Sequence, residues 1–167
     1  MTLRRLRELK EPEALPLLAW SLLTILKAEC LLRATSLTAL LGRFGRDPSS
    51  GATRRETPPQ PDGGSLERIR RYSNFISKAL LRSRHPCLLR CLVLYRYGRR
   101  RGVPVSIHFG VKRGVDGLQG HSWVSLDGTP LFEAEEALRS YASIYTYPED
   151  LHRSDLHWAL GAVERMS

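Results

Sequence analysis

Apolar positions recur at helical spacing in three stretches of the chain. The stretch from Leu15 to Phe44 is rich in apolar residues and predicts one or two helices. Residues Leu66 to Leu81 combine apolar positions near helical spacing with several arginines, which predicts a basic amphipathic helix. A third helix is predicted from Cys87 to Arg101, because Pro86 suits a first helical turn and Gly102 ends the helix.

Alternating apolar and polar residues predict a small antiparallel sheet after this helix. The stretch from Val103 to Val111 alternates at period two, as a strand does. Residues Lys112 to Gly120 contain three glycines and are expected to form a loop. Residues His121 to Glu133 then predict a hairpin that turns at Asp127 and Gly128.

Residues 46 to 65 separate the apolar N-terminal stretch from the rest of the chain. They include four prolines and three glycines but no large apolar side chain, which predicts a linker or long loop. We therefore expect an N-terminal apolar helical region over 1–45, the linker over 46–65 and a folded domain over 66–167. A chain of 167 residues has room for one sizeable core.

The charge is uneven along the chain. There are 26 Lys and Arg against 17 Asp and Glu, which gives a net charge of +9. Between Arg68 and Arg113 there are thirteen basic residues and no acidic one. Such a segment favours a polyanionic or acidic partner, such as nucleic acid, anionic lipid or an acidic peptide. A basic nucleic-acid-binding module is therefore the alternative reading, although no nucleic-acid-binding motif is recognisable and no nucleic acid is expected.

The cysteines and the N-terminal flank favour the cytoplasm. Three cysteines are an odd number, and they are too few for a disulfide-stapled secreted scaffold. An export signal is not expected, because Glu8, Glu11 and Glu13 lie before the apolar run and Pro16 interrupts it. The thirteen uncharged residues from Ala14 to Leu26 fall short of the roughly 20 that span a bilayer, so no transmembrane segment is expected.

The lengths of the predicted elements bring Cys87 and His121 together. A helix from Cys87 to Arg101 is about 22 Å long, and a strand from Val103 to Val111 returns about 27 to 30 Å. The strand therefore ends near the start of the helix, with His121 shortly after it. The helix dipole favours the thiolate of a cysteine at a helix N-terminus, and an imidazole within reach can share the proton. Cys87 and His121 are thus a candidate nucleophile and base.

Hairpin register decides whether a carboxylate joins this pair. A three-residue loop of Leu126, Asp127 and Gly128 would place His121 opposite Glu133. A two-residue Asp-Gly turn would instead put Glu133 on the other face of the sheet. The sequence permits both, and the first supplies a carboxylate that would orient the imidazole. Asp127 is expected to be a turn residue, because six strand residues place it about 20 Å from His121.

The neighbouring cysteine and histidines have simpler readings. Cys91 lies one turn further into the helix and is expected to be a core residue. Zinc ligation by Cys87, Cys91, His85 and His121 is a weak hypothesis, because a lone C-x3-C spacing is not a zinc motif. We therefore expect no metal and no cofactor. Trp123 shares a strand face with His121, and it either lines a peptide groove or packs in the core.

These residues resemble the lasso peptide B proteins, specifically the separately encoded leader peptidase with a transglutaminase-like cysteine protease fold. The resemblance lies in Cys87–Leu94, in the helix end Arg99–Val103, in Phe109–Val111 and in His121–Val124. It covers the chain well from Pro86 to Glu133, about a third of its length.

By this resemblance Cys87 takes the position of the nucleophile and His121 that of the base. Glu133 takes the acidic position twelve residues after the histidine, where the family usually has aspartate. The implied fold is α+β, papain-like, with N-terminal helices and a catalytic helix packed on a small antiparallel sheet. The implied reaction is hydrolysis of a lasso precursor peptide to remove its leader.

The resemblance also implies partners. They are the precursor peptide, a small leader-recognition protein and the ATP-dependent cyclase that closes the ring on the freed amine. We expect the N-terminal apolar helix and the basic middle of the chain to form the docking surface. A catalytically inactive transglutaminase-like scaffold that only binds the peptide remains a further alternative.

Overall fold

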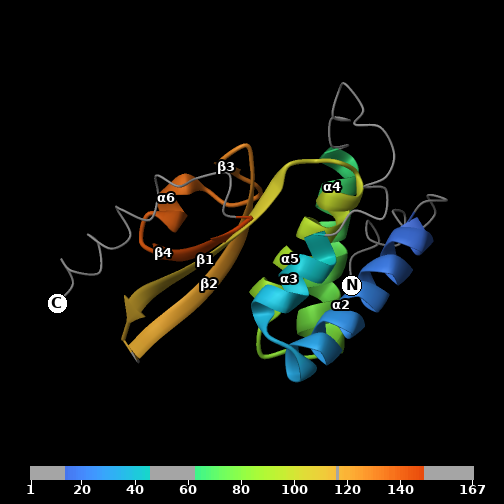
Figure 1. The fold of residues 1–167 in the computed structure, drawn as a ribbon, viewed down its shortest axis with the longest axis horizontal. Coiled ribbons are helices and arrows are strands. Elements are labelled where there is room, and N and C mark those ends of the chain that lie inside the picture. The colour runs from blue at the N-terminus through green and yellow to red at the C-terminus, as the bar shows by residue number, and fades with distance from the viewer. Residues whose placement is uncertain (1–13, 46–62, 116, 149–167) are drawn as a thin grey trace.

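The computed structural model describes residues 14–45, 63–115 and 117–148. Figure 1 shows its longer helices gathered on one side and a small antiparallel sheet on the other. In chain order the elements are α2 (Ala14–Ala34), α3 (Leu37–Gly45), α4 (Gly63–Phe75), the π-helical turn η1 (Ile76–Leu80), α5 (Pro86–Arg100), β1 (Val105–Gly114), β2 (Gly117–Leu126), β3 (Thr129–Pro130), α6 (Glu135–Leu138) and β4 (Ala142–Tyr147). The predicted α+β fold is confirmed.

The apolar N-terminal stretch forms two helices that contribute to the core. Ile25 and Ala28 of α2 are fully buried, as are Leu40 of α3 and Leu92 of α5, and all four belong to one hydrophobic cluster. Full burial of an isoleucine or leucine side chain contributes about 1.5 to 3 kcal/mol. The prediction of one or two helices between Leu15 and Phe44 is therefore confirmed, and both helices pack into the core that supports α5.

Helix α2 is also long and apolar enough to cross a membrane, judged by its length and composition alone. Core helices of soluble proteins and signal sequences have the same properties. The buried face of α2 includes the polar residues Ser21 and Thr24. This face packs within the protein, whereas Leu15 and Leu23 are exposed.

Helix α4 begins earlier than predicted, at Gly63, inside the expected linker. The rest of that linker, residues 46–62, lies outside the described residues. The predicted single helix from Leu66 to Leu81 is divided into α4 and the π-helical turn η1. The Leu81 N–H donates to the Ile76 carbonyl at 2.8 Å, five residues back, as a π-helix requires. This wider turn ends the helix shortly before the loop that leads to Cys87.

Helix α5 begins and ends close to the predicted residues. Pro86 occupies its first turn, where a missing N–H removes no helical hydrogen bond. At the other end Gly102 has a φ of 71°, which glycine adopts without steric cost. The Gly102 N–H donates to the Arg99 carbonyl and the Val103 N–H to the Gly98 carbonyl, the pair of bonds of a Schellman cap. Val103 therefore closes the helix, and the strand begins two residues later than predicted.

The sheet has the strand order β3-β2-β1-β4, with each neighbouring pair antiparallel. Strand β1 returns alongside α5, and one face of the sheet packs against the helices (Figure 1). Ile107 and Val124 are cross-strand partners on this face and are buried in the core. Residues of the opposite parity, including His108 and Trp123, lie on the other face.

Residues 112–114 and 117–120 are paired strand rather than part of the predicted glycine-rich loop. Lys112 pairs with Gln119, and Gly114 pairs with Gly117. Gly117 has a φ of 112°, a conformation open to glycine. The glycines thus allow β1 and β2 to continue to a tight turn, and His121 lies inside β2 rather than after a loop.

The turn between β2 and β3 contains two residues, Asp127 and Gly128. Leu126 pairs with Thr129 across this turn. The φ angles of Asp127 and Gly128 are 48° and 81°, and a two-residue turn of type I′ requires positive φ at both positions. Of the two registers that the sequence permits, the structure has the two-residue turn and not the three-residue loop, and the prediction that Asp127 is a turn residue is confirmed.

We predict that the contact between α5 and β1 tolerates no side chain at Gly98. A Cβ atom there would lie 2.0 Å from Cγ2 of Val105, so Gly98→Ala should lower the free energy of unfolding by about 1 to 3 kcal/mol. At Gly42 of α3 a Cβ would meet only the Tyr147 hydroxyl, at 3.9 Å. Gly42→Ala is thus the matched control and should be neutral or stabilising by up to about 1 kcal/mol. Urea denaturation measures the free energy of unfolding of both variants. Equal values would contradict the close contact between Gly98 of α5 and Val105 of β1.

Candidate active site

Cys87 is the second residue of α5 and half-buried. The pKa of its thiol is lowered to about 7. The largest cause is a hydrogen-bonding interaction with the His121 side chain, and burial opposes it. The Ser122 hydroxyl and the Leu88 backbone N–H lower the pKa further. Because the helix N-terminus also favours an anion, the thiolate is accessible near neutral pH.

His121 lies on β2 and interacts with both Cys87 and Glu133. The largest cause is the hydrogen-bonding interaction with Cys87, followed by that with Glu133, and together they raise the pKa of the imidazole to about 9 although burial acts against the charged form. Nε2 of His121 is 2.7 Å from Oε2 of Glu133, which leaves Nδ1 as the nitrogen for the thiol. Between about pH 7 and pH 9 the pair therefore favours the thiolate and the imidazolium.

Glu133 contacts His121 although strand pairing alone would place it on the other face. The last strand-like bond runs from the Leu131 N–H to the Val124 carbonyl. Phe132 then has a φ of 67°, in the left-handed region, which redirects the chain away from the strand. The side chain of Glu133 thus comes to His121 by a route that neither of the two considered registers describes.

Arg90 holds the other oxygen of the Glu133 carboxylate. Its guanidinium donates a hydrogen bond to Oε1 of Glu133, and both side chains are largely buried. Burial acts to raise the pKa of Glu133, but the hydrogen bonds and charges of His121 and Arg90 outweigh it and hold the pKa below its ordinary value. Glu133 is therefore ionised and fixed from two sides when it orients the imidazole.

Sequence reasoning assigned no role to Arg90 or to Ser122. Arg90 lies three residues after Cys87, so the two side chains share one face of α5, and this spacing is the signal that could have found it. Ser122 directly follows His121 and is buried on the core face of β2. Its effect on the pKa of Cys87 depends on how the helix meets the strand, which no local pattern encodes.

An aromatic stack supports the histidine. Trp123 lies between two imidazoles, with ring centroids 5.3 Å from His108 and 6.2 Å from His121. Tyr141 contacts His121 from another side, at 5.1 Å. A Cβ atom at Gly110 would lie 2.8 Å from the Trp123 ring, so the glycine makes room for it. Trp123 is only 8% exposed, and of its two readings the structure selects packing.

Cys91 is fully buried in the core, as predicted, and its thiol donates to the Ser122 carbonyl at 3.1 Å. Burial raises the pKa of this thiol to about 12, so it stays protonated. Among the residues that the structure describes, no group of three or more His, Cys, Asp or Glu side chains is arranged to hold a metal ion. Of the two cysteines on α5, only Cys87 is therefore suited to act as a nucleophile.

Comparison with known proteins places this geometry in a family. Residues 46–146, more than half of the chain, match the transglutaminase-like superfamily. The chain belongs to the transglutaminase-like superfamily. No curated protein and no solved structure gives a significant match. The superfamily includes cysteine peptidases and transglutaminases, and the matched segment contains the cysteine, the histidine and the carboxylate described above.

A thiolate, an imidazolium and an orienting carboxylate are suited to acyl transfer. The thiolate can attack a carbonyl carbon, and the imidazolium can donate its proton to the leaving group. The resulting thioester can pass its acyl group to water or to an amine. The arrangement in this transglutaminase-like chain is thus compatible with hydrolysis and with transfer, and the acceptor decides between them.

We predict that Cys87 titrates with His121 as a pair. In a Cys30→Ser background, which removes an exposed thiol, the iodoacetamide alkylation rate should rise with pH through about 7. In His121→Ala the largest cause of the lowered pKa is lost, so the midpoint should move toward that of an ordinary cysteine, about 8.5. Mass spectrometry at each pH locates the label. An unchanged midpoint in the histidine variant would exclude the pair.

Proposed function

We propose that this transglutaminase-like protein is a cysteine peptidase that removes the leader from a lasso peptide precursor. The proposal rests on two interactions near the N-terminus of α5: the Cys87 thiol interacts with His121, and His121 interacts with the Glu133 carboxylate. They accompany a pKa of about 7 for the Cys87 thiol. The resemblance of Pro86 to Glu133 to the lasso leader peptidases supports the choice of substrate. The net charge of +9 suits a substrate or partner that carries acidic groups.

The proposed reaction proceeds in two steps. The Cys87 thiolate attacks the carbonyl carbon of the scissile peptide bond, and the His121 imidazolium donates its proton to the departing amine of the core peptide. The leader then remains on Cys87 as a thioester. His121, now neutral, takes a proton from water, which attacks the thioester, and this proton returns to the sulfur as the leader acid leaves. The freed amine is what an ATP-dependent cyclase partner would use.

Glu133 acts through the histidine in this proposal. It accepts a hydrogen bond from Nε2–H of His121, so it fixes the ring orientation and stabilises the imidazolium that forms beside the thiolate. A small leader-recognition protein would bring the precursor to this site. Positioning of the precursor by this partner and the pair of Cys87 thiolate and His121 imidazolium would together account for the rate of leader removal.

The first test separates the two cysteines of α5. Cys87→Ala should abolish leader removal and leave the fold intact, since the residue is at a helix end. Cys91→Ala should retain activity and cost about 1 kcal/mol or more of stability through lost packing. Mass spectrometry of the precursor, incubated with each variant and the recognition protein, measures cleavage. Cleavage by Cys87→Ala, or an equal loss of activity in both variants, would overturn the assignment of Cys87 as the nucleophile. Absence of cleavage by the wild type would favour an inactive scaffold or a nucleic-acid binder.

The second test changes the carboxylate. Glu133→Gln should lower the turnover number by roughly 10² to 10⁴, the range of general acid–base assistance, because a neutral amide does not stabilise the imidazolium. Glu133→Asp should keep more activity than Glu133→Gln, because the charge is retained. Asp127→Asn at the turn is the control and should be nearly silent, since asparagine tolerates positive φ. An active Glu133→Gln beside an inactive Asp127→Asn would overturn the role of Glu133.

A further inference from the structure

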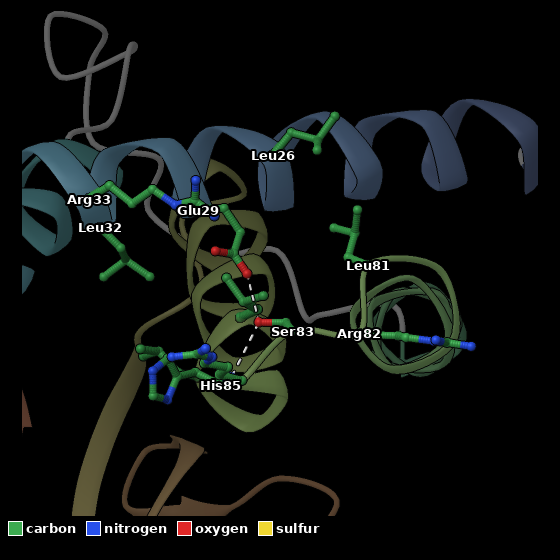
Figure 2. A pocket seen from close by; sticks show the side chains of 11 residues that line it. Leu26, Glu29, Leu32, Arg33, Leu81, Arg82, Ser83 and His85 are labelled. Carbon is green, nitrogen blue, oxygen red and sulfur yellow. Dashed lines mark hydrogen bonds between the residues drawn. The ribbon is translucent and has the colours of Figure 1, made fainter.

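A cleft of about 770 Å³ lies beside the start of α5, and Figure 2 shows the side chains that line it. Its walls come from three segments that are far apart in sequence: α2, the loop of residues 81–85 and the first turn of α5. Leu88, which follows Cys87 directly, is part of the lining, as is His85, two residues before Cys87. Cys87 itself is not part of this lining, so the cleft adjoins the first turn of α5 around the side away from the thiol.

The lining combines apolar side chains with unpaired positive charge. Leu26, Leu81 and Leu88 contribute apolar walls, and Leu26 is 45% exposed there. Arg82 and Arg84 lie in the lining loop, and Figure 2 shows Arg82 extending away from Ser83. A third guanidinium comes from Arg33 of α2. None of the three arginines forms a side-chain hydrogen bond or ion pair within the described ranges 14–45, 63–115 and 117–148.

Hydrogen bonds connect two of the segments that line the cleft. The Ser83 hydroxyl donates to Oε1 of Glu29 at 2.6 Å, and Oγ of Ser83 accepts the His85 N–H at 3.2 Å (Figure 2). Helix α2 is thus tied to the loop that precedes the nucleophile. The single carboxylate of Glu29 against three arginines leaves the lining with a net positive charge.

We propose that this cleft binds the substrate segment next to the scissile bond, and that it selects an apolar side chain flanked by acidic residues. The inference rests on the proposed peptidase function and deepens it. An extended peptide advances about 3.3 Å per residue, and a helix is about 10 Å across. A side chain about three to four residues from the reacting carbonyl therefore passes around the first turn of α5 and reaches the cleft at Leu88. The leucines desolvate the apolar side chain, and Arg33, Arg82 and Arg84 attract the flanking carboxylates.

The experiment measures binding without turnover, by fluorescence anisotropy on the Cys87→Ala protein. The probes are three fluorescein-labelled peptides of sequence Gly-Ser-X-Y-X-Ser-Gly, in which X-Y-X is Asp-Leu-Asp, Lys-Leu-Lys or Asp-Ser-Asp. We expect the Asp-Leu-Asp peptide to bind about 10-fold more tightly than Asp-Ser-Asp, because leucine burial is favourable. It should bind about 5-fold or more tightly than Lys-Leu-Lys, and this advantage should fall as salt is added.

Variants assign the two preferences to the cleft. Arg82→Glu combined with Arg84→Glu should remove the preference for aspartate over lysine, and Leu26→Ser should reduce the preference for leucine over serine. Arg113→Glu, an exposed charge change on strand β1, is the matched control and should leave all three affinities unchanged. Equal affinities for the three peptides, absence of binding, or an equal effect of the control would overturn the proposal.

A second measurement separates this inference from the proposed function. Wild-type protein is incubated with the precursor peptide, and cleavage is followed by mass spectrometry. Selective binding to Cys87→Ala without any cleavage by the wild type would contradict the peptidase function, while the cleft would still bind apolar, acidic peptide. Cleavage that is unaffected by the combined Arg82→Glu and Arg84→Glu substitutions would contradict the proposed role of the cleft in substrate binding, but not the peptidase function.

Discussion

The contact between the first turns of α5 and strand β2 determines the geometry of the site. The buried Cys91 thiol donates to the Ser122 carbonyl at 3.1 Å. Cys91 lies one helical turn after Cys87, and Ser122 directly follows His121, so this contact sets the spacing between the thiol and the imidazole. The surrounding core is close-packed and adjusts little. A change in the packing of α5 would therefore alter the distance between the Cys87 and His121 side chains.

Four side chains of alternating charge extend from this contact. The Arg90 guanidinium holds the Glu133 carboxylate, the carboxylate holds the His121 imidazole, and the imidazole interacts with the Cys87 thiol. Each charge stabilises its neighbours in a partly buried setting, where Coulomb interactions are stronger than in water. Because the pKa of His121 rises to about 9 while that of Cys87 falls to about 7, the ion pair is favoured near neutral pH without a separate activating step.

Local sequence patterns located the helix and its first residues, because Pro86 and Gly102 are strong start and stop signals. The lengths of α5 and β1 then sufficed to bring His121 to Cys87. The route to Glu133 was not readable, since it depends on the left-handed conformation of Phe132, which non-glycine residues rarely adopt. The glycine spacing of residues 112–120 was equally ambiguous, because glycines mark loops as well as tight turns between paired strands.

The match to the superfamily begins at residue 46, so α2 and α3 lie outside it. The three interacting side chains of Cys87, His121 and Glu133 lie within the matched part. In contrast, α2 supplies Glu29, which bonds to Ser83 of the loop before the nucleophile, and α2 also provides one wall of the adjacent cleft. In the proposed peptidase, a segment such as α2, which packs on the common scaffold near the thiol, can change which peptides fit without altering the proposed acyl-transfer chemistry. Differences in substrate choice should thus arise from helices such as α2, because the charges that activate the thiol do not depend on them.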